Sequence, residues 1–205
     1  MGLRMVHSSR RTIPPHVLQI ARQVARHEAG HYVAARVLGF KTSDMELTMH
    51  DGQGGHHASC DIKLYQPLTD EAAIVDYLER RIVVLTAGAM SETLRNGEFD
   101  NQAACDSSNT GGAMNDRAKA REYQQLLRNI RHKTAPSDEK EMLDQLSVID
   151  QALWNRASEL VVAEHEQIEG IAAALADRML YLGQKAVLTG AEIDAMPSVR
   201  ARFGL

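Results

Sequence analysis

One predicted helix constrains this sequence more than any other feature, because it combines an apolar stripe with two histidines. Between residues 14 and 38, apolar residues recur at alternating three- and four-residue steps, which is the pattern of an amphipathic helix. His27 and His31 fall on that apolar stripe rather than on the polar face. Two prolines at 14–15 suit a first helical turn, and Gly39 suits a left-handed end. We therefore predict a helix that buries two imidazoles one turn apart.

His27, Glu28 and His31 form the pattern His-Glu-x-x-His, whose spacing has a chemical reason. Side chains four residues apart lie on one helix face, so both imidazoles can bind one zinc ion at about 2.0–2.1 Å. Glu28 lies beside them, where its carboxylate can accept a proton from metal-bound water. The alternative is a chance pattern of solvated histidines on a surface helix. The apolar stripe and the mid-helix Gly30, which costs about 1 kcal/mol relative to Ala, favour the metal site.

A catalytic zinc ion needs a third protein ligand and one open position. Ala34 and Val37 stand where the metzincin pattern would place Gly and His, so the third ligand must come from elsewhere. Asp116 is our candidate, because it falls on the apolar stripe of a helix predicted at 113–132, where an unpaired carboxylate would be costly. The alternative is an ordinary first-turn Asp that the helix dipole stabilises.

Other residues are candidates for supporting roles. Glu92 falls at the inward end of a predicted helix, where its carboxylate can accept the second N–H of a ligand histidine. A solvated Glu in a last helical turn is the alternative. Three further histidines are reserve ligands, which we expect to be surface residues: His50, His56 and His57.

A small β-hairpin is predicted after the first helix, because apolar and polar residues alternate on both sides of the glycine-rich segment 51–55. The apolar positions of its first strand are Met45, Leu47 and Met49. We interpret this strand as an edge strand that binds an extended peptide substrate by adding it to the sheet. Simple packing of the hairpin into the core is the alternative.

The rest of the chain has helical periodicity, so the predicted fold class is mainly α with one small β-hairpin. We expect Thr69 to cap a helix that Gly97 closes, and Ser137 to cap another. The stretch 98–112 is rich in Asn, Ser, Asp and Gly and predicts a polar loop. The further predicted helices are at 69–97, 113–132, 137–164 and 166–182. The predicted domain organisation is a flexible basic tail at 1–13, one domain at 14–196, and a C-terminal tail at 197–205.

Composition narrows the classes of partner. The net charge of −4 gives no basic surface, so we expect no nucleic acid. We expect no membrane span, because no apolar run is long enough, and no secretory signal. Cys60 and Cys105 lack Cys-x-x-Cys spacing, which is typical of a reducing compartment. A cytoplasmic location is therefore expected.

Three segments resemble the peptidase domain of the FtsH family of ATP-dependent zinc proteases. The first is His27-Glu28-Ala29-Gly30-His31 together with the residues up to Gly39. The second runs from Leu85 to Leu94 and is similar to the family's Gly-Arg-Ala-Ala-Glu-Glu-Leu helix. The third is Gly112-Ala113-Met114-Asn115-Asp116. The last is similar to Gly-Ala-x-Asn/Ser-Asp, whose Asp is the family's third zinc ligand. The resemblance covers roughly residues 15–195. It implies an FtsH peptidase-like helical fold with one catalytic zinc ion bound by His27, His31 and Asp116.

The sequence also departs from that family. Tyr32 stands where the family usually has Ala, Thr93 replaces the second Glu, and the hairpin lacks the Pro-Arg-Gly motif. No G-x-x-x-x-G-K-[ST] motif occurs, so unfolded or flexible polypeptides are the expected substrates unless a separate ATPase delivers others. Whether the chain forms a homo-oligomer is left open, since the family's rings depend on the ATPase domain.

The expected function is a zinc metalloendopeptidase with Glu28 as general base. The first alternative is a non-catalytic, zinc-stabilised binding or adaptor module that presents the hairpin and the segment 98–112 to a partner. The second is a metal-dependent hydrolase that acts on something other than peptides.

Overall fold

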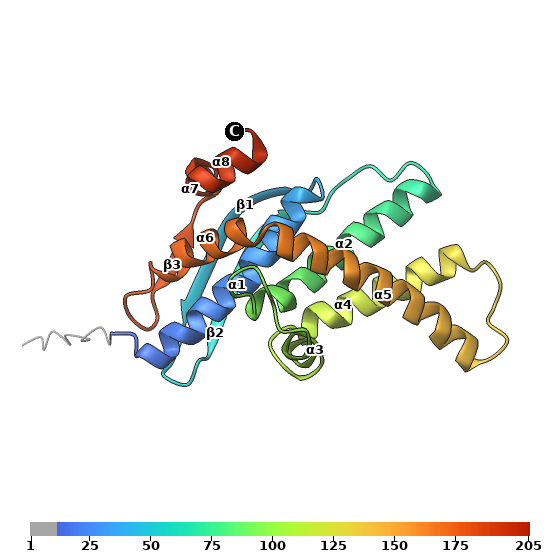
Figure 1. Cartoon of the computed structure of the whole chain (residues 1–205), viewed down its shortest axis with the longest axis horizontal. Coiled ribbons are helices and arrows are strands. Elements are labelled where there is room, and N and C mark those ends of the chain that lie inside the picture. Colours follow the sequence, from blue (N-terminus) through green and yellow to red (C-terminus); the bar gives the residue numbers. More distant parts are fainter. Residues whose placement is uncertain (1–11) are drawn as a thin grey trace, which may run out of the picture.

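The computed structural model describes residues 12–205, and this part of the chain is mainly helical with one small antiparallel sheet (Figure 1). The helices are α1 (Pro15–Val37), α2 (Glu71–Glu92), α3 (Asn101–Thr110), α4 (Met114–Arg131), α5 (Glu139–Ala163), α6 (His165–Ala176), α7 (Gly190–Ala195) and α8 (Pro197–Phe203). The strands are β1 (Lys41–Met49), β2 (His56–Lys63) and β3 (Lys185–Leu188). The predicted fold class, mainly α with a small β element, is confirmed at this level.

Helix α1 forms the centre of the molecule, with α2, α6 and the sheet packed around it (Figure 1). It begins at Pro15 and ends before Gly39, whose φ is +82°, as predicted. The mid-helix Gly30 lies against α2: a Cβ there would lie 2.3 Å from Ser91 Oγ and 2.8 Å from the Ala87 carbonyl oxygen. The glycine therefore lets the backbones of α1 and α2 approach closely, which sets the position of the two histidines relative to α2.

The sheet has the order β2-β1-β3, so β1 is its central strand. Met45 pairs with Cys60 of β2 on one side and with Leu188 of β3 on the other. The predicted hairpin is confirmed, but the prediction that its first strand is an edge strand is wrong. The side chains of Met45, Leu47 and Met49 are fully buried and belong to the hydrophobic core, so they have no surface for a substrate.

The third strand explains this error. Strand β3 comes from the far end of the chain, about 140 residues after β1, and has only four residues, Lys185–Leu188. Such a short strand shows little alternation of apolar and polar residues, and its pairing partner is distant in sequence. The outer edge of β2 is left without a neighbouring strand in the part of the chain that the structure describes.

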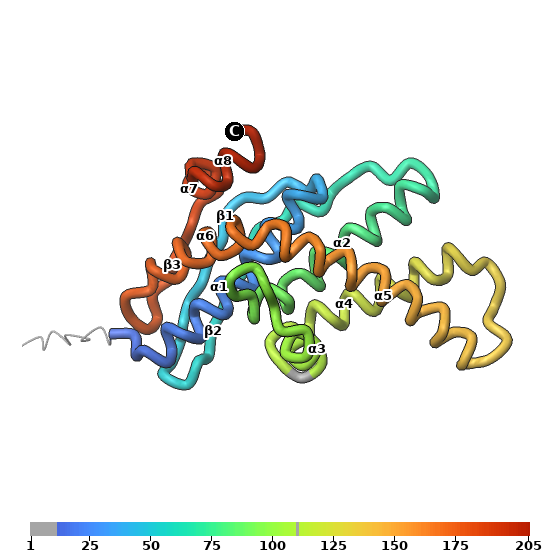
Figure 2. Tube along the Cα trace, in the orientation of Figure 1, coloured from blue at the N-terminus to red at the C-terminus, as the bar shows by residue number. Residues whose placement is uncertain are grey.

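The segment 98–112 is another correction, because it contains helix α3 rather than an extended polar loop. Asp100 begins this helix by accepting a hydrogen bond from the Ala103 N–H at 3.0 Å. Only Ala104 of the helix is a fully buried apolar residue, so the sequence shows no apolar stripe. Figure 2 shows the chain turning back from the end of α2 through α3 to the start of α4.

Two predicted caps are displaced by one residue. Asp70, not Thr69, accepts the N–H of Ala73 at the start of α2, and Asp138, not Ser137, begins α5. Aspartate is as good a cap as Ser or Thr, so neighbouring candidates could not be separated. Helix α2 also ends at Glu92, while Gly97, with φ of +82°, lies in the following turn. Helix α6 ends at Ala176, before the predicted 182, because the chain turns there toward β3.

The C-terminal residues continue the fold. Thr189 and Glu192 cap α7 reciprocally, and α8 follows within the segment 197–205 that we expected to fray. Val199 of α8 is fully buried, and the ring of Phe203 lies 4.6 Å from the Arg36 guanidinium carbon.

At the other end, the prediction of a flexible tail at 1–13 falls mostly on residues 1–11, which lie outside the described part. Thr12 and Ile13, by contrast, pair with Tyr181 and Leu180.

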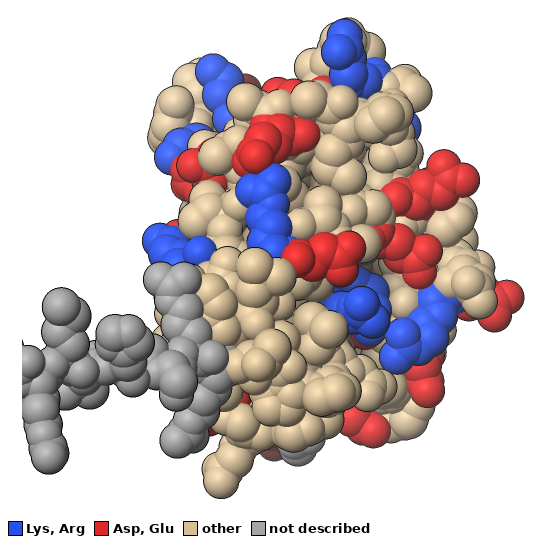
Figure 3. Space-filling model, turned by 90° about the vertical axis from the view of Figure 1, so that its left-hand side faces the viewer, with Lys and Arg blue, Asp and Glu red and all other residues tan. Residues whose placement is uncertain are grey.

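The surface and the helices bear on possible partners. Figure 3 shows Lys and Arg side chains intermingled with Asp and Glu on one face. None of the helices between residues 12 and 205 has both the length and the apolar composition that a bilayer crossing requires. Cys60 and Cys105 are free thiols.

Candidate metal centre

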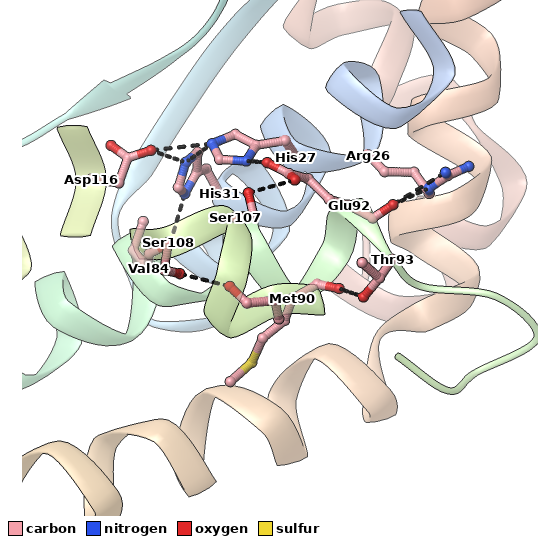
Figure 4. Close-up of polar contacts among 11 residues, drawn as sticks. Arg26, His27, His31, Val84, Met90, Glu92, Thr93, Ser107, Ser108 and Asp116 are labelled. Carbon is pink, nitrogen blue, oxygen red and sulfur yellow. Dashed lines mark hydrogen bonds and ion pairs between the residues drawn. The ribbon is translucent and has the colours of Figure 1, made fainter. Parts of the chain in front are cut away.

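Two helices that are distant in sequence bring three side chains to one point (Figure 4). His27 and His31 lie one turn apart on α1, and Asp116 lies in the first turn of α4. Asp116 Oδ2 lies 3.1 Å from Nε2 of His27 and 3.1 Å from Nε2 of His31, and the two Nε2 atoms lie 2.9 Å apart. The structure therefore assembles the three residues that the sequence analysis singled out as ligands.

Hydrogen bonds on the other side of each ring determine which nitrogens face this point. His27 Nδ1 lies 2.6 Å from the Glu92 carboxylate, and His31 Nδ1 lies 2.7 Å from the Val84 carbonyl oxygen. Both partners are acceptors, so each Nδ1 must carry the proton and donate it. In the neutral rings, both Nε2 atoms then present lone pairs to the same point as an Asp116 oxygen.

Three such acceptor atoms repel one another unless a cation or protons lie between them. In a tetrahedral zinc site with bonds of about 2.0–2.1 Å, the ligand atoms are roughly 3.3 Å apart. The separations of 2.9–3.1 Å are close to this value. Among the described residues, these three are the cluster of His, Cys, Asp or Glu side chains whose ligand atoms lie near enough to share an ion. The donor set of two imidazoles and one carboxylate is one that zinc accepts in proteins.

The surrounding charges favour a cation. Burial lowers the pKa of His27, but hydrogen bonds with Asp116 and Glu92 outweigh burial and raise that pKa to about 10. Burial acts to raise the pKa of Asp116, but the contacts with His27 and His31 hold it well below its usual value. These shifts mean that the neighbouring carboxylates stabilise positive charge at His27.

Glu92 occupies the supporting position that the sequence analysis proposed for it. Its Oε1 accepts from His27, and its Oε2 accepts from the Ser107 hydroxyl at 2.7 Å. Burial acts to raise the pKa of Glu92, but His27 and Ser107 lower it, so the carboxylate stays ionised. Sequence reasoning missed Ser107, because the residue belongs to the segment that we had interpreted as a loop.

Gly88 of α2 provides the space for the imidazoles. A Cβ at this residue would lie 2.4 Å from Cε1 and 2.5 Å from Nε2 of His31, and 3.0 Å from Nε2 of His27. Any side chain at residue 88 would therefore overlap the two rings. The small-residue run from Ala87 to Ala89 was a signal in the sequence, but periodicity alone could not relate it to the histidines.

Two hollows flank the three side chains. The larger hollow, of about 460 Å³, lies between α1, β2 and the start of α4; its wall includes His27, Glu28, His57, Glu92, Asn115 and Asp116. The smaller hollow, of about 260 Å³, lies between α1, α2 and β2; its wall includes Glu28, His31, Cys60, Arg81, Leu85 and Asp116. Glu28 and Asp116 thus line both hollows, and Ala58 of β2 does the same.

Glu28 lies where a general base would be needed, since it is next to His27 on α1 and faces both hollows. Burial and contact with Glu28 raise the pKa of the Cys60 thiol well above its usual value, so this thiol is neutral. The reserve ligands His50, His56 and His57 are exposed, as expected, and they are not part of the cluster of three.

The contact between Glu92 and His27 leads to a prediction. We expect Glu92→Gln to lower the zinc affinity by roughly 10- to 100-fold, because a neutral amide orients the imidazole less firmly and makes it less basic. Competition with a fluorescent zinc chelator measures the affinity. Glu98→Gln, in an exposed residue six positions away, is the matched control. An unchanged affinity in Glu92→Gln would contradict the supporting role.

Comparison of the sequence with models of known protein families and with curated proteins yields no match.

Proposed function

We propose that this protein is a zinc-dependent metalloendopeptidase that cleaves unfolded or flexible polypeptides. The observation that carries the proposal is the convergence of His27 Nε2, His31 Nε2 and one Asp116 oxygen on a single point, with Glu28 in the wall of the hollow beside it. The resemblance of residues 15–195 to the FtsH peptidase domain supports the same activity and an FtsH peptidase-like fold. Those family properties belong to the proposal rather than to the geometry.

The residues divide the chemistry among them. His27, His31 and Asp116 would hold the ion, and Glu92 and the Val84 carbonyl oxygen keep the two rings in one tautomer and orientation. Zinc held by these residues would supply a polarised water whose pKa is lowered to about 7. Glu28 would accept a proton from the attacking water and return it to the leaving amine.

The substrate position must differ from the one predicted at Met45, Leu47 and Met49. The described sheet has two outer edges, β2 and β3, and β2 is the one that borders both hollows, through Ala58. An extended peptide that adds to this edge would pass from one hollow to the other, across Glu28 and Asp116. Backbone hydrogen bonds to β2 would then hold the peptide independently of its sequence.

The function is tested on unfolded casein. We expect purified protein to contain one zinc ion per chain, to degrade casein, and to stop when 1,10-phenanthroline removes the metal. Added zinc should restore cleavage. A ligand at 1,000 times its Kd stabilises the folded state by about 4 kcal/mol, so the melting temperature should fall when the metal is removed. Tightly bound zinc with no cleavage at all would instead favour the adaptor module, and cleavage that persists without metal would reject both.

Partners follow from the same proposal. A separate ATPase would be required for folded substrates, and casein needs none. Comparison of casein with a stably folded test protein therefore separates cleavage by this chain alone from cleavage that depends on an unfolding partner.

A further inference from the structure

Arg81 is a buried cation without an acidic partner among the residues that the structure describes. Its residue surface is only 6% exposed, and its Nε and Nη1 atoms have no hydrogen bond with any of the residues that the structure describes. No carboxylate among these residues forms an ion pair with it, and its nearest aromatic ring, Phe40, lies 5.8 Å from the guanidinium carbon. Arginine keeps its charge when buried, so leaving the charge unpaired is costly. Such a residue suggests an anion that the protein itself does not supply.

Arg81 lies in the wall of the smaller hollow, beside the candidate metal centre. His31, Glu28 and Asp116 line the same hollow. The two carboxylates are engaged elsewhere, since Asp116 contacts both histidines and Glu28 contacts Cys60. The Cys60 thiol is neutral because burial raises its pKa, so it provides no counter-charge. A ligand in the smaller hollow would therefore meet an unpaired positive charge next to the candidate catalytic base.

We propose that Arg81 binds a carboxylate of the substrate in the smaller hollow, so that the enzyme prefers to cleave next to an acidic group. The guanidinium is a planar fork of donors that matches a carboxylate, and pairing in a buried site is stronger than in water. Two sources have this chemistry: the side chain of Asp or Glu beside the cleaved bond, and the C-terminal carboxylate of a short peptide. This inference rests on the proposed peptidase function.

Lys119 also lines the smaller hollow, but it is a weaker candidate than Arg81 for binding the substrate carboxylate. Its side chain is 59% exposed, and its Nζ lies 3.9 Å from Asp116 Oδ1. An exposed, solvated ammonium contributes little to the recognition of an anion. The selectivity should therefore depend on Arg81 and not on Lys119.

The cleavage test uses matched quenched-fluorescent peptides with zinc-loaded protein. One pair has Glu or Gln next to the cleaved bond, and a second pair has a free or an amidated C-terminus at the same distance. We expect kcat/KM to be at least about 10-fold higher for the carboxylate member of one pair, because charge-assisted hydrogen bonds are worth a factor of this order or more. The pair that shows the difference identifies the source. Equal rates in both pairs would overturn the inference while leaving the peptidase function intact.

Variants assign the effect to Arg81. In Arg81→Met the ratio should fall to about 1, because the carboxylate substrate loses more of its cleavage rate than the neutral substrate does. Arg81→Lys should restore part of the ratio, and Lys119→Met should keep it. The melting temperature of Arg81→Met should be unchanged or higher, since the variant removes an unpaired buried charge. A lower melting temperature with unchanged selectivity would show that Arg81 is structural and would overturn the inference.

A binding measurement separates the inference from the peptidase proposal. N-acetylglutamate α-amide and N-acetylglutamine α-amide differ only in the side-chain charge, and N-acetylglutamine with a free α-carboxylate represents a C-terminus. Titration followed by NMR should detect saturable binding of one carboxylate probe to wild-type protein and none to Arg81→Met. If this binding occurs without cleavage of any peptide, the carboxylate site stands and the peptidase function fails. If wild type and Arg81→Met bind the probes equally, the carboxylate site fails.

Discussion

Glu28→Gln is expected to reduce cleavage of casein by roughly 100- to 10,000-fold, the range that a positioned general base contributes. The amide is nearly the same size as the carboxylate but cannot accept the proton of the attacking water. Glu28 is not one of the three clustered side chains, so zinc content and zinc affinity should stay at their wild-type values. Initial rates on casein and metal analysis of the same preparations provide the two measurements.

Glu122→Gln is the matched control for this variant. Glu122 is exposed on α4, six residues after Asp116, so the substitution makes the same change from carboxylate to amide at a residue that lines neither hollow. It should leave both rate and zinc content unchanged. Wild-type turnover in Glu28→Gln would reject the proposed mechanism, and loss of zinc from Glu28→Gln would show that Glu28 has a role in metal binding instead.

Local patterns predicted the helix that forms the centre of the molecule, because all of its signals lie within the helix or directly beside it. The prolines at its start, the three- and four-residue steps, and Gly39 after its end agree with the structure of α1. The hairpin was equally local. What could not be predicted was β3, since a four-residue strand becomes recognisable only through its pairing with β1. Without β3, the central strand was mistaken for an edge strand.

The candidate metal centre, like the fold, could be predicted from the sequence only in part. The spacing of His27 and His31 on one helix follows from helix geometry alone. Asp116 lies 85 residues after His31, and sequence physics left its role open between metal ligand and ordinary first-turn Asp. The resemblance to the FtsH family favoured the ligand, and the structure now places its oxygen 3.1 Å from both imidazoles. Ser107 and Arg81 carried no signal, because their environment depends on how α2, α3 and β2 pack around the site.

Gly88→Ala is expected to abolish zinc binding at concentrations that saturate the wild-type protein. The added methyl group would lie 2.4–2.5 Å from two atoms of His31 and 3.0 Å from Nε2 of His27. One of two things must then yield: the rings rotate away from Asp116, or α2 moves away from α1. Both outcomes separate the ligand atoms. We expect the affinity for zinc to fall by more than the 10- to 100-fold that the loss of an orienting partner causes, and peptidase activity to fall with it.

Helix propensity alone predicts that Gly88→Ala is more stable than the wild type, so a loss of zinc cannot be explained by a weaker helix. Alanine is about 1 kcal/mol better than glycine inside a helix, so without the rings the variant would be stabilised. Gly170→Ala in α6 is the matched control, because its Cβ would meet Met196 Cε at 3.6 Å and Ser198 Oγ at 3.8 Å, which are ordinary contacts. That variant should keep its zinc and melt at the same temperature or higher. If Gly88→Ala binds zinc as tightly as Gly170→Ala, the imidazoles do not lie against α2 as described, and the arrangement of the proposed metal centre is wrong.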